Sequence, residues 1–130
     1  MQSPRIMQKN ILSVDLEDWG QSTYDLNAPI TNYVVENTSK LLDIFSQAKS
    51  KATFFCQGLV AEKFPELIKR IHQAGHEIGT HGWSHRSVQE LGQKGFKSEL
   101  YKSVKILEDI IGEKVHGHRA PDFSIDIRSD

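Results

Sequence analysis

Short apolar runs alternate along this chain with longer segments in which apolar residues recur every three or four positions. Four runs have the length and composition of strands: 11–14, 51–56, 76–81 and 115–119. Three longer segments place their apolar residues on one helical face: 32–48, 64–75 and 96–111. Strands that alternate with helices pair in parallel through right-handed crossovers, so the pattern predicts an α/β fold.

Turn residues support the ends of these predicted helices. Pro65 suits the first turn of the second helix, and Gly75 suits its C-terminal cap. Gly112 follows the last apolar position of the third helix and predicts its end there.

Chemically unusual residues follow each predicted strand. In order, these are the acids of 15–18, then Cys56 and Gln57, then His81 and His85, and finally 119–122. In parallel α/β folds, reactive groups collect at the carboxyl ends of the strands. The sequence therefore predicts that these segments meet at one edge of the sheet.

His81 and His85 are the first candidates for metal binding. Imidazoles four residues apart on a helix share a face and can hold one metal ion. The alternative is a pair of surface histidines in a turn rich in glycine and serine. A carboxylate beside them would give three protein ligands with one position open, as in hydrolytic rather than structural metal sites.

The acidic cluster could supply that carboxylate. Three acids within four residues repel one another, and a cation would relieve that repulsion. Asp15 and Glu17 point to the same side if the strand continues, while Asp18 points away. Glu17 is thus the preferred metal ligand, Asp18 is the alternative, and Asp15 is the candidate base. A solvated loop remains the simpler interpretation of this cluster.

Other residues beside these segments have two interpretations each. Arg119 either forms a surface ion pair or holds the Asp15 carboxylate ionised and oriented. Trp19 and Trp83 suit the faces of sugars, but they could equally pack in the core. With Pro121, they are the candidate substrate contacts.

Composition narrows the class of protein. The chain has 130 residues, which fits one domain, and its net charge of −1 gives no case for nucleic acid or anionic membrane as a partner. Its single cysteine, Cys56, excludes an internal disulfide framework. No apolar stretch approaches the roughly 20 residues of a membrane span, and the N-terminus lacks the features of a signal peptide. A cytoplasmic location is the resulting expectation.

Four motifs, taken in order, resemble those of the polysaccharide deacetylases that carry the NodB homology domain. They are 13–19, 52–55, 75–85 and 118–121. The resemblance runs from about Ile11 to the last residue, and the motif with the two histidines is the most specific. It implies the N-terminal part of a deformed (β/α) barrel over 11–130, preceded by an extension over 1–10.

The resemblance also implies a reaction. The family holds a divalent metal ion, often zinc, with an acid and two histidines, here His81 and His85, and removes N-acetyl groups from glycans. By position, Asp15 would be its catalytic base, and Arg119 would tune that base. The common family motif has two adjacent aspartates followed by glycine. This chain instead has an acid, a spacer and an acid, which leaves Glu17 and Asp18 as alternatives for the ligand.

The family's later motifs, including a histidine that serves as general acid, are expected beyond residue 130. The domain is therefore expected to be incomplete, the chain alone to be inactive, and its open sheet edge to favour self-association. Two other functions remain open for the same scaffold. One is an allantoinase-like cyclic-amide hydrolase, and the other is a carbohydrate-binding relic without catalysis.

Overall fold

The computed structural model describes residues 9–126, so residues 1–8 of the predicted extension lie outside it. It contains a parallel three-stranded sheet in the order β1-β2-β3, with strands Ser13–Leu16, Thr53–Cys56 and Glu77–Thr80. The helices are α1 (Tyr33–Gln47), α2 (Gly58–Lys63), α3 (Pro65–Gln73) and α4 (Val88–Ile111). The described residues also form two shorter elements, a π-helix η1 (Gly20–Tyr24) and a 3-10 helix η2 (Pro121–Phe123).

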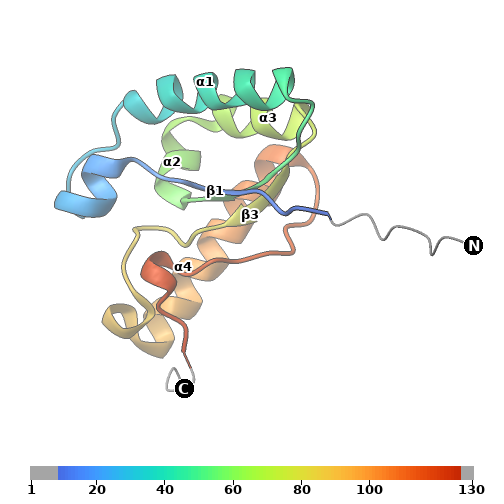
Figure 1. Ribbon diagram of the computed structural model, residues 1–130. Coiled ribbons are helices and arrows are strands. Elements are labelled where there is room, and N and C mark those ends of the chain that lie inside the picture. The colour runs from blue at the N-terminus through green and yellow to red at the C-terminus, as the bar shows by residue number, and fades with distance from the viewer. Residues whose placement is uncertain (1–8, 127–130) are drawn as a thin grey trace, which may run out of the picture.

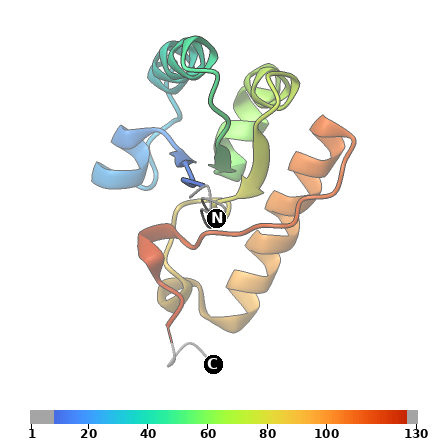
Figure 2. The same cartoon turned by 45° about the vertical axis from the view of Figure 1, so that its right-hand side comes forward.

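The helices cover one face and one side of the sheet. Helices α1 and α3 lie next to each other above the strands, and α4 runs along the β3 side (Figures 1 and 2). Alternation along β2 sends Phe54 and Cys56 into the core, where both are fully buried. The Phe54 ring meets Phe45 of α1 edge to face at 6.1 Å. This packing leaves Phe55 on the opposite face of the sheet.

That opposite face is where the strands present their polar residues. The register aligns Asp15 of β1 with Phe55 of β2 and Gly79 of β3. A Cβ atom on Gly79 would lie 2.7 Å from the Phe55 ring, so only glycine leaves room for this ring. The parallel pairing continues just past the strand ends, where the Gln57 amide donates to the Leu16 carbonyl and the His81 amide donates to the Cys56 carbonyl. These two hydrogen bonds bring Glu17 and His81 close together.

The segment 115–119 corrects one prediction. It runs beside β3 as expected, but it forms a single bridge, between Thr80 and His118, rather than a fourth strand. Two hydrogen bonds make this bridge, one from the Thr80 amide to the Gly117 carbonyl and one from the Arg119 amide to the Thr80 carbonyl, both 2.9 Å. Val115 is the only large aliphatic residue in this stretch, so little packing extends the pairing into a ladder.

None of the described helices is both long and apolar enough to cross a lipid bilayer.

Candidate metal centre

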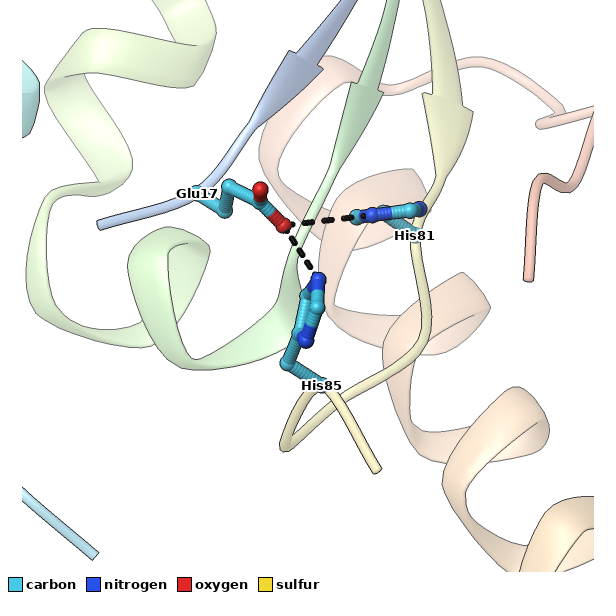
Figure 3. Close-up of side chains that lie close together, drawn as sticks. All are labelled: Glu17, His81 and His85. Atoms are coloured by element: carbon cyan, nitrogen blue, oxygen red, sulfur yellow. Dashed lines mark ion pairs between the residues drawn. The ribbon is translucent and has the colours of Figure 1, made fainter. Parts of the chain in front are cut away.

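Glu17, His81 and His85 converge on one point above the carboxyl ends of β1 and β3 (Figure 3). The Glu17 Oε2 atom lies 3.2 Å from His81 Nε2 and 2.5 Å from His85 Nε2. Both imidazoles are buried, and one donor atom from each of the three residues lies within 4.8 Å of the others. A carboxylate and two imidazoles are the donor set of many catalytic zinc sites. These side chains therefore fit a divalent metal ion.

The two histidines do not lie on a helix, which corrects the geometric argument made from their spacing. They belong to the loop between β3 and α4, and His85 has a left-handed backbone with φ of 67°. The turn at Gly82, with φ of 74°, folds the loop back so that both rings face Glu17. The imidazoles thus meet through loop geometry, not through a shared helical face.

A backbone contact sets the orientation of the His81 ring. Its Nδ1 atom lies 2.6 Å from the carbonyl oxygen of Arg119, to which the ring N–H donates. This hydrogen bond turns the other ring nitrogen, Nε2, towards Glu17 Oε2, 3.2 Å away. The segment 115–119 therefore orients a candidate ligand through its main chain.

The two alternative acids face different ways. The carboxylate of Asp18 is buried and accepts a hydrogen bond from the Thr31 amide. It fixes the loop that follows η1 and lies outside the group formed by Glu17 and the histidines. Of the two acids, Glu17 has the geometry of a ligand.

Asp15 and Arg119 form an ion pair beside this group. The Arg119 Nη1 atom donates to Asp15 Oδ1 at 2.9 Å, and Nη2 donates to Ser13 Oγ at 2.9 Å. The guanidinium also lies over the Phe55 ring, 4.4 Å from its centroid. Asp15 Oδ2 remains 3.9 Å from His81 Nε2. The ion pair therefore lies directly beside the candidate metal ligands.

The electrostatics of the group follow from its contacts. Burial alone would raise the pKa of Glu17, but hydrogen bonds and charge from His81 and His85 outweigh burial and hold it at about 2. Burial alone would lower the pKa of His85, but the Glu17 carboxylate raises it above its usual value. Without metal, the group therefore favours an ionised Glu17 beside a protonated His85.

These shifts predict how the stability of the metal-free chain depends on pH. Glu17 stabilises the fold fully above its unfolded pKa of 4.5, and this contribution disappears as the pH falls towards about 2. His85 stabilises the fold fully below its unfolded pKa of 6.5, and this contribution is lost as the pH rises through its raised pKa. The pair should therefore contribute most between these two unfolded values.

A comparison with Glu17→Gln checks this expectation. With chelator present and at low protein concentration, wild type should exceed the variant by roughly 4–8 °C in Tm near pH 5.5, since a charged buried hydrogen bond contributes about 1–2 kcal/mol. The difference should shrink at pH 3 and at pH 9. A Tm difference that stays constant from pH 3 to pH 9 would contradict the proposed contribution of the Glu17–His85 ion pair.

The three candidate substrate contacts differ in exposure. Trp19 is 65% exposed and meets Tyr24 edge to face at 4.7 Å, beside a cavity of about 630 Å³ that Asp15 and Glu17 also line. Trp83 is 8% exposed, and Lys102 Nζ lies 3.7 Å from its ring centroid. Pro121 is buried as well. Burial agrees with the packing interpretation of Trp83, whereas Trp19 remains accessible to a ligand.

Glu99 holds the histidine loop, a role that was not predicted from the sequence. The Glu99 carboxylate of α4 accepts from the Ser84 hydroxyl at 2.7 Å and from the Ser84 amide at 3.2 Å. The sequence does contain a signal for this role. Glu99 lies three residues after Phe96 and therefore on the apolar face of the predicted helix. An acid on such a face needs a partner, and here the partner lies next to His85.

Comparisons with known proteins agree with this geometry. A family model described as polysaccharide deacetylase matches residues 21–129. A peptidoglycan-N-acetylglucosamine deacetylase of Bacillus cereus is 40% identical over 78 residues, which is 60% of this chain and 28% of the relative. Chitin deacetylase 1 of Cryptococcus neoformans is 30% identical over 114 residues, which is 88% of this chain and 23% of the relative.

The fold has similar counterparts among solved structures. Peptidoglycan deacetylase PdaC from Bacillus subtilis matches with a TM-score of 0.73 and 26% identity, over 92% of this chain and 52% of that one. The α/β architecture described above is thus the N-terminal part of a NodB-type barrel. The chain spans about a quarter of the length of each of these two curated relatives and about half of this structure.

Proposed function

The chain belongs to the polysaccharide deacetylase family, and from this premise we propose that it carries the metal ligands and the base of an N-deacetylase. The substrate would be an N-acetylated glycan, and the reaction would hydrolyse the bond between the acetyl carbon and the sugar nitrogen. The observation that carries the proposal is the meeting of Glu17, His81 and His85 beside the Asp15–Arg119 ion pair. Relatives named as peptidoglycan and chitin deacetylases support this substrate class.

We assign roles to the side chains as follows. Glu17, His81 and His85 would hold a divalent metal ion, expected to be zinc, which supplies Lewis-acid chemistry that acidifies water and polarises a carbonyl. Asp15 would take the proton of the attacking water, and Arg119 would keep that carboxylate oriented by its 2.9 Å hydrogen bond. Trp19, an exposed aromatic residue beside the cavity, would contact the sugar ring.

The departing amine also needs a proton, and the described residues offer no assigned donor for it. His118 lies in the right motif, but its ring packs 5.7 Å from Phe96, and burial lowers its pKa. Because the chain spans about half of the matched structure, we propose that 11–130 is a partial domain and that the general acid comes from further residues. The chain alone would then turn over substrate very weakly or not at all.

Strand β1 has a partner on one side only within residues 9–126. Several large apolar side chains near it are exposed, among them Ile11, Leu12 and Tyr33. Unpaired strand edges and apolar surface favour association, so we propose that the isolated chain self-associates through this edge.

One experiment tests the function and the need for further residues together. Acetate release from N-acetylglucosamine oligomers is measured for the chain alone and for a longer polypeptide that supplies the rest of a family domain. We expect release only from the longer form, with complete loss after chelation and recovery with Zn²⁺. Size exclusion should give a larger apparent mass than a monomer for the chain alone. Deacetylation that survives chelation would refute the metal proposal, and hydrolysis of a cyclic amide instead would favour the allantoinase-like alternative.

A further inference from the structure

The two segments that carry the proposed metal ligands are tied together by one buried amide, and we propose that Gln21 is a positioning residue of the metal site. Its side chain would hold the Glu17 segment and the histidine loop at the spacing that metal binding requires. The inference rests on the proposed function for the identity of the site, while the tether itself is a feature of the fold.

Gln21 lies in η1 and is 1% exposed. Its Nε2 atom donates to the Ser84 carbonyl at 3.0 Å and to the Leu26 carbonyl at 2.9 Å. Along the chain, Gln21 follows Glu17 by four residues, and Ser84 directly precedes His85. One amide group therefore connects two segments that lie more than sixty residues apart in sequence and carry ligands of the same site.

A second amide sets the orientation of the first. Gln57, fully buried at the end of β2, donates from Nε2 to Gln21 Oε1 at 2.9 Å. The oxygen of Gln21 is thus turned to Gln57, and its NH₂ group faces the two carbonyls. Ser84 is held from the other side by Glu99 of α4, which accepts from both its amide and its hydroxyl. Ser84, the residue before His85, is consequently held by hydrogen bonds to both η1 and α4.

The physical reason for a functional effect is preorganisation. Loss of the Gln21 donors would leave the buried Ser84 carbonyl and the half-buried Leu26 carbonyl without this partner, which favours movement of the loop towards water. His85 already has a left-handed backbone, so this loop has little intrinsic preference for its conformation. Residues that support metal ligands from outside typically change metal affinity about 10–100-fold when mutated.

The test is the Zn²⁺ affinity of the 130-residue chain, measured by competition with a chromophoric chelator. Gln21→Met fills a similar volume but has no donor, and it should raise the Kd about 10–100-fold. Gln57→Met should raise it less. The matched control is Leu42→Ala, which removes core packing in α1 away from the site and should leave the Kd within about threefold.

The result that overturns the proposal is a Kd within about threefold of wild type in a folded Gln21→Met chain, or an equal rise in Leu42→Ala. Amide hydrogen exchange without metal separates the tether from the metal proposal. Exchange at 81–87 should accelerate at least tenfold in Gln21→Met and not in Leu42→Ala. If wild type binds no Zn²⁺, the proposed metal site fails, and the tether is then judged by exchange alone, where unchanged rates refute it.

Discussion

Replacing His85 with alanine should weaken Zn²⁺ binding by the 130-residue chain at least about 100-fold. Structural zinc sites with four ligands bind with roughly 10–16 kcal/mol, so one ligand accounts for about 3 kcal/mol, and each 1.4 kcal/mol is about a tenfold change. His85 Nε2 lies 2.5 Å from the Glu17 carboxylate, at the centre of the group. Competition titration with a chromophoric chelator measures the Kd directly.

Two further variants separate ligand loss from other effects. His85 has φ of 67°, a conformation that alanine adopts with strain and glycine adopts freely. His85→Gly should therefore lose affinity as His85→Ala does, although its backbone is unstrained. His72→Ala removes a histidine that pairs with Glu113 outside the site, at 3.2 Å, and should leave the Kd unchanged. Comparable losses in His72→Ala, or less than fivefold loss in both His85 variants, would exclude His85 as a ligand.

Asp15→Asn should reduce turnover about 100- to 10,000-fold in a polypeptide that deacetylates N-acetylglucosamine oligomers, because general base catalysis contributes about that much. Asparagine keeps the shape of the side chain and can still accept the hydrogen bond that Arg119 donates to Asp15 Oδ1 at 2.9 Å in the wild type. It cannot accept a proton from water. Rates of acetate release at saturating substrate give the size of the effect.

The same sample should bind Zn²⁺ almost as tightly as wild type, since Asp15 is not one of the three proposed ligands. Ser13→Ala is the matched control, because it removes the second contact of Arg119, at 2.9 Å, and leaves Asp15 in place. It should cost only a few-fold in turnover. A turnover within tenfold of wild type for Asp15→Asn would mean that another group is the base.

Long periodic segments were predictable, and short ones were not. The helix expected over 32–48 is confirmed as Tyr33–Gln47, and the one over 64–75 as Pro65–Gln73, since apolar spacing and turn residues agree there. By contrast, η1 and α2 are five and six residues long, too short to show a period. Their conformation depends on contacts with distant segments of the same chain, such as those that Gln21 makes with Ser84 and Gln57.

Helix α4 illustrates an overlooked local signal. It was expected from residue 96, but it begins at Val88, with non-helical dihedral angles at Gly92. Ser87 caps the helix, because its hydroxyl accepts from the Glu90 amide at 3.2 Å and donates to the Glu90 carboxylate at 3.1 Å. This pair was readable in the sequence. Gly92 interrupts the helical dihedral angles within the first turns, so the apolar spacing of α4 is regular only after this residue.

The edge at which the candidate residues meet was predictable for a different reason. Parallel pairing places the carboxyl ends of β1 and β3 at the same edge of the sheet, on either side of β2, and Glu17 and His81 each directly follow one of these ends. The turn that returns His85 to the same point depends on Gly82 and on packing of Trp83 and Ser84 against α4. Spacing alone could not distinguish that loop from a helical turn, and the roles of these residues stay predictions.

The alternation along β1 also limits how this region can evolve. Leu16 is buried in the core, while its neighbours Asp15 and Glu17 lie on the side of the ion pair and the histidines. A one-residue insertion or deletion inside the strand would exchange the two faces, and so would remove core packing and both carboxylates at once. Length variation should consequently be absent between Ser13 and Glu17 and should concentrate in exposed turns, such as the one around Asp25–Ala28.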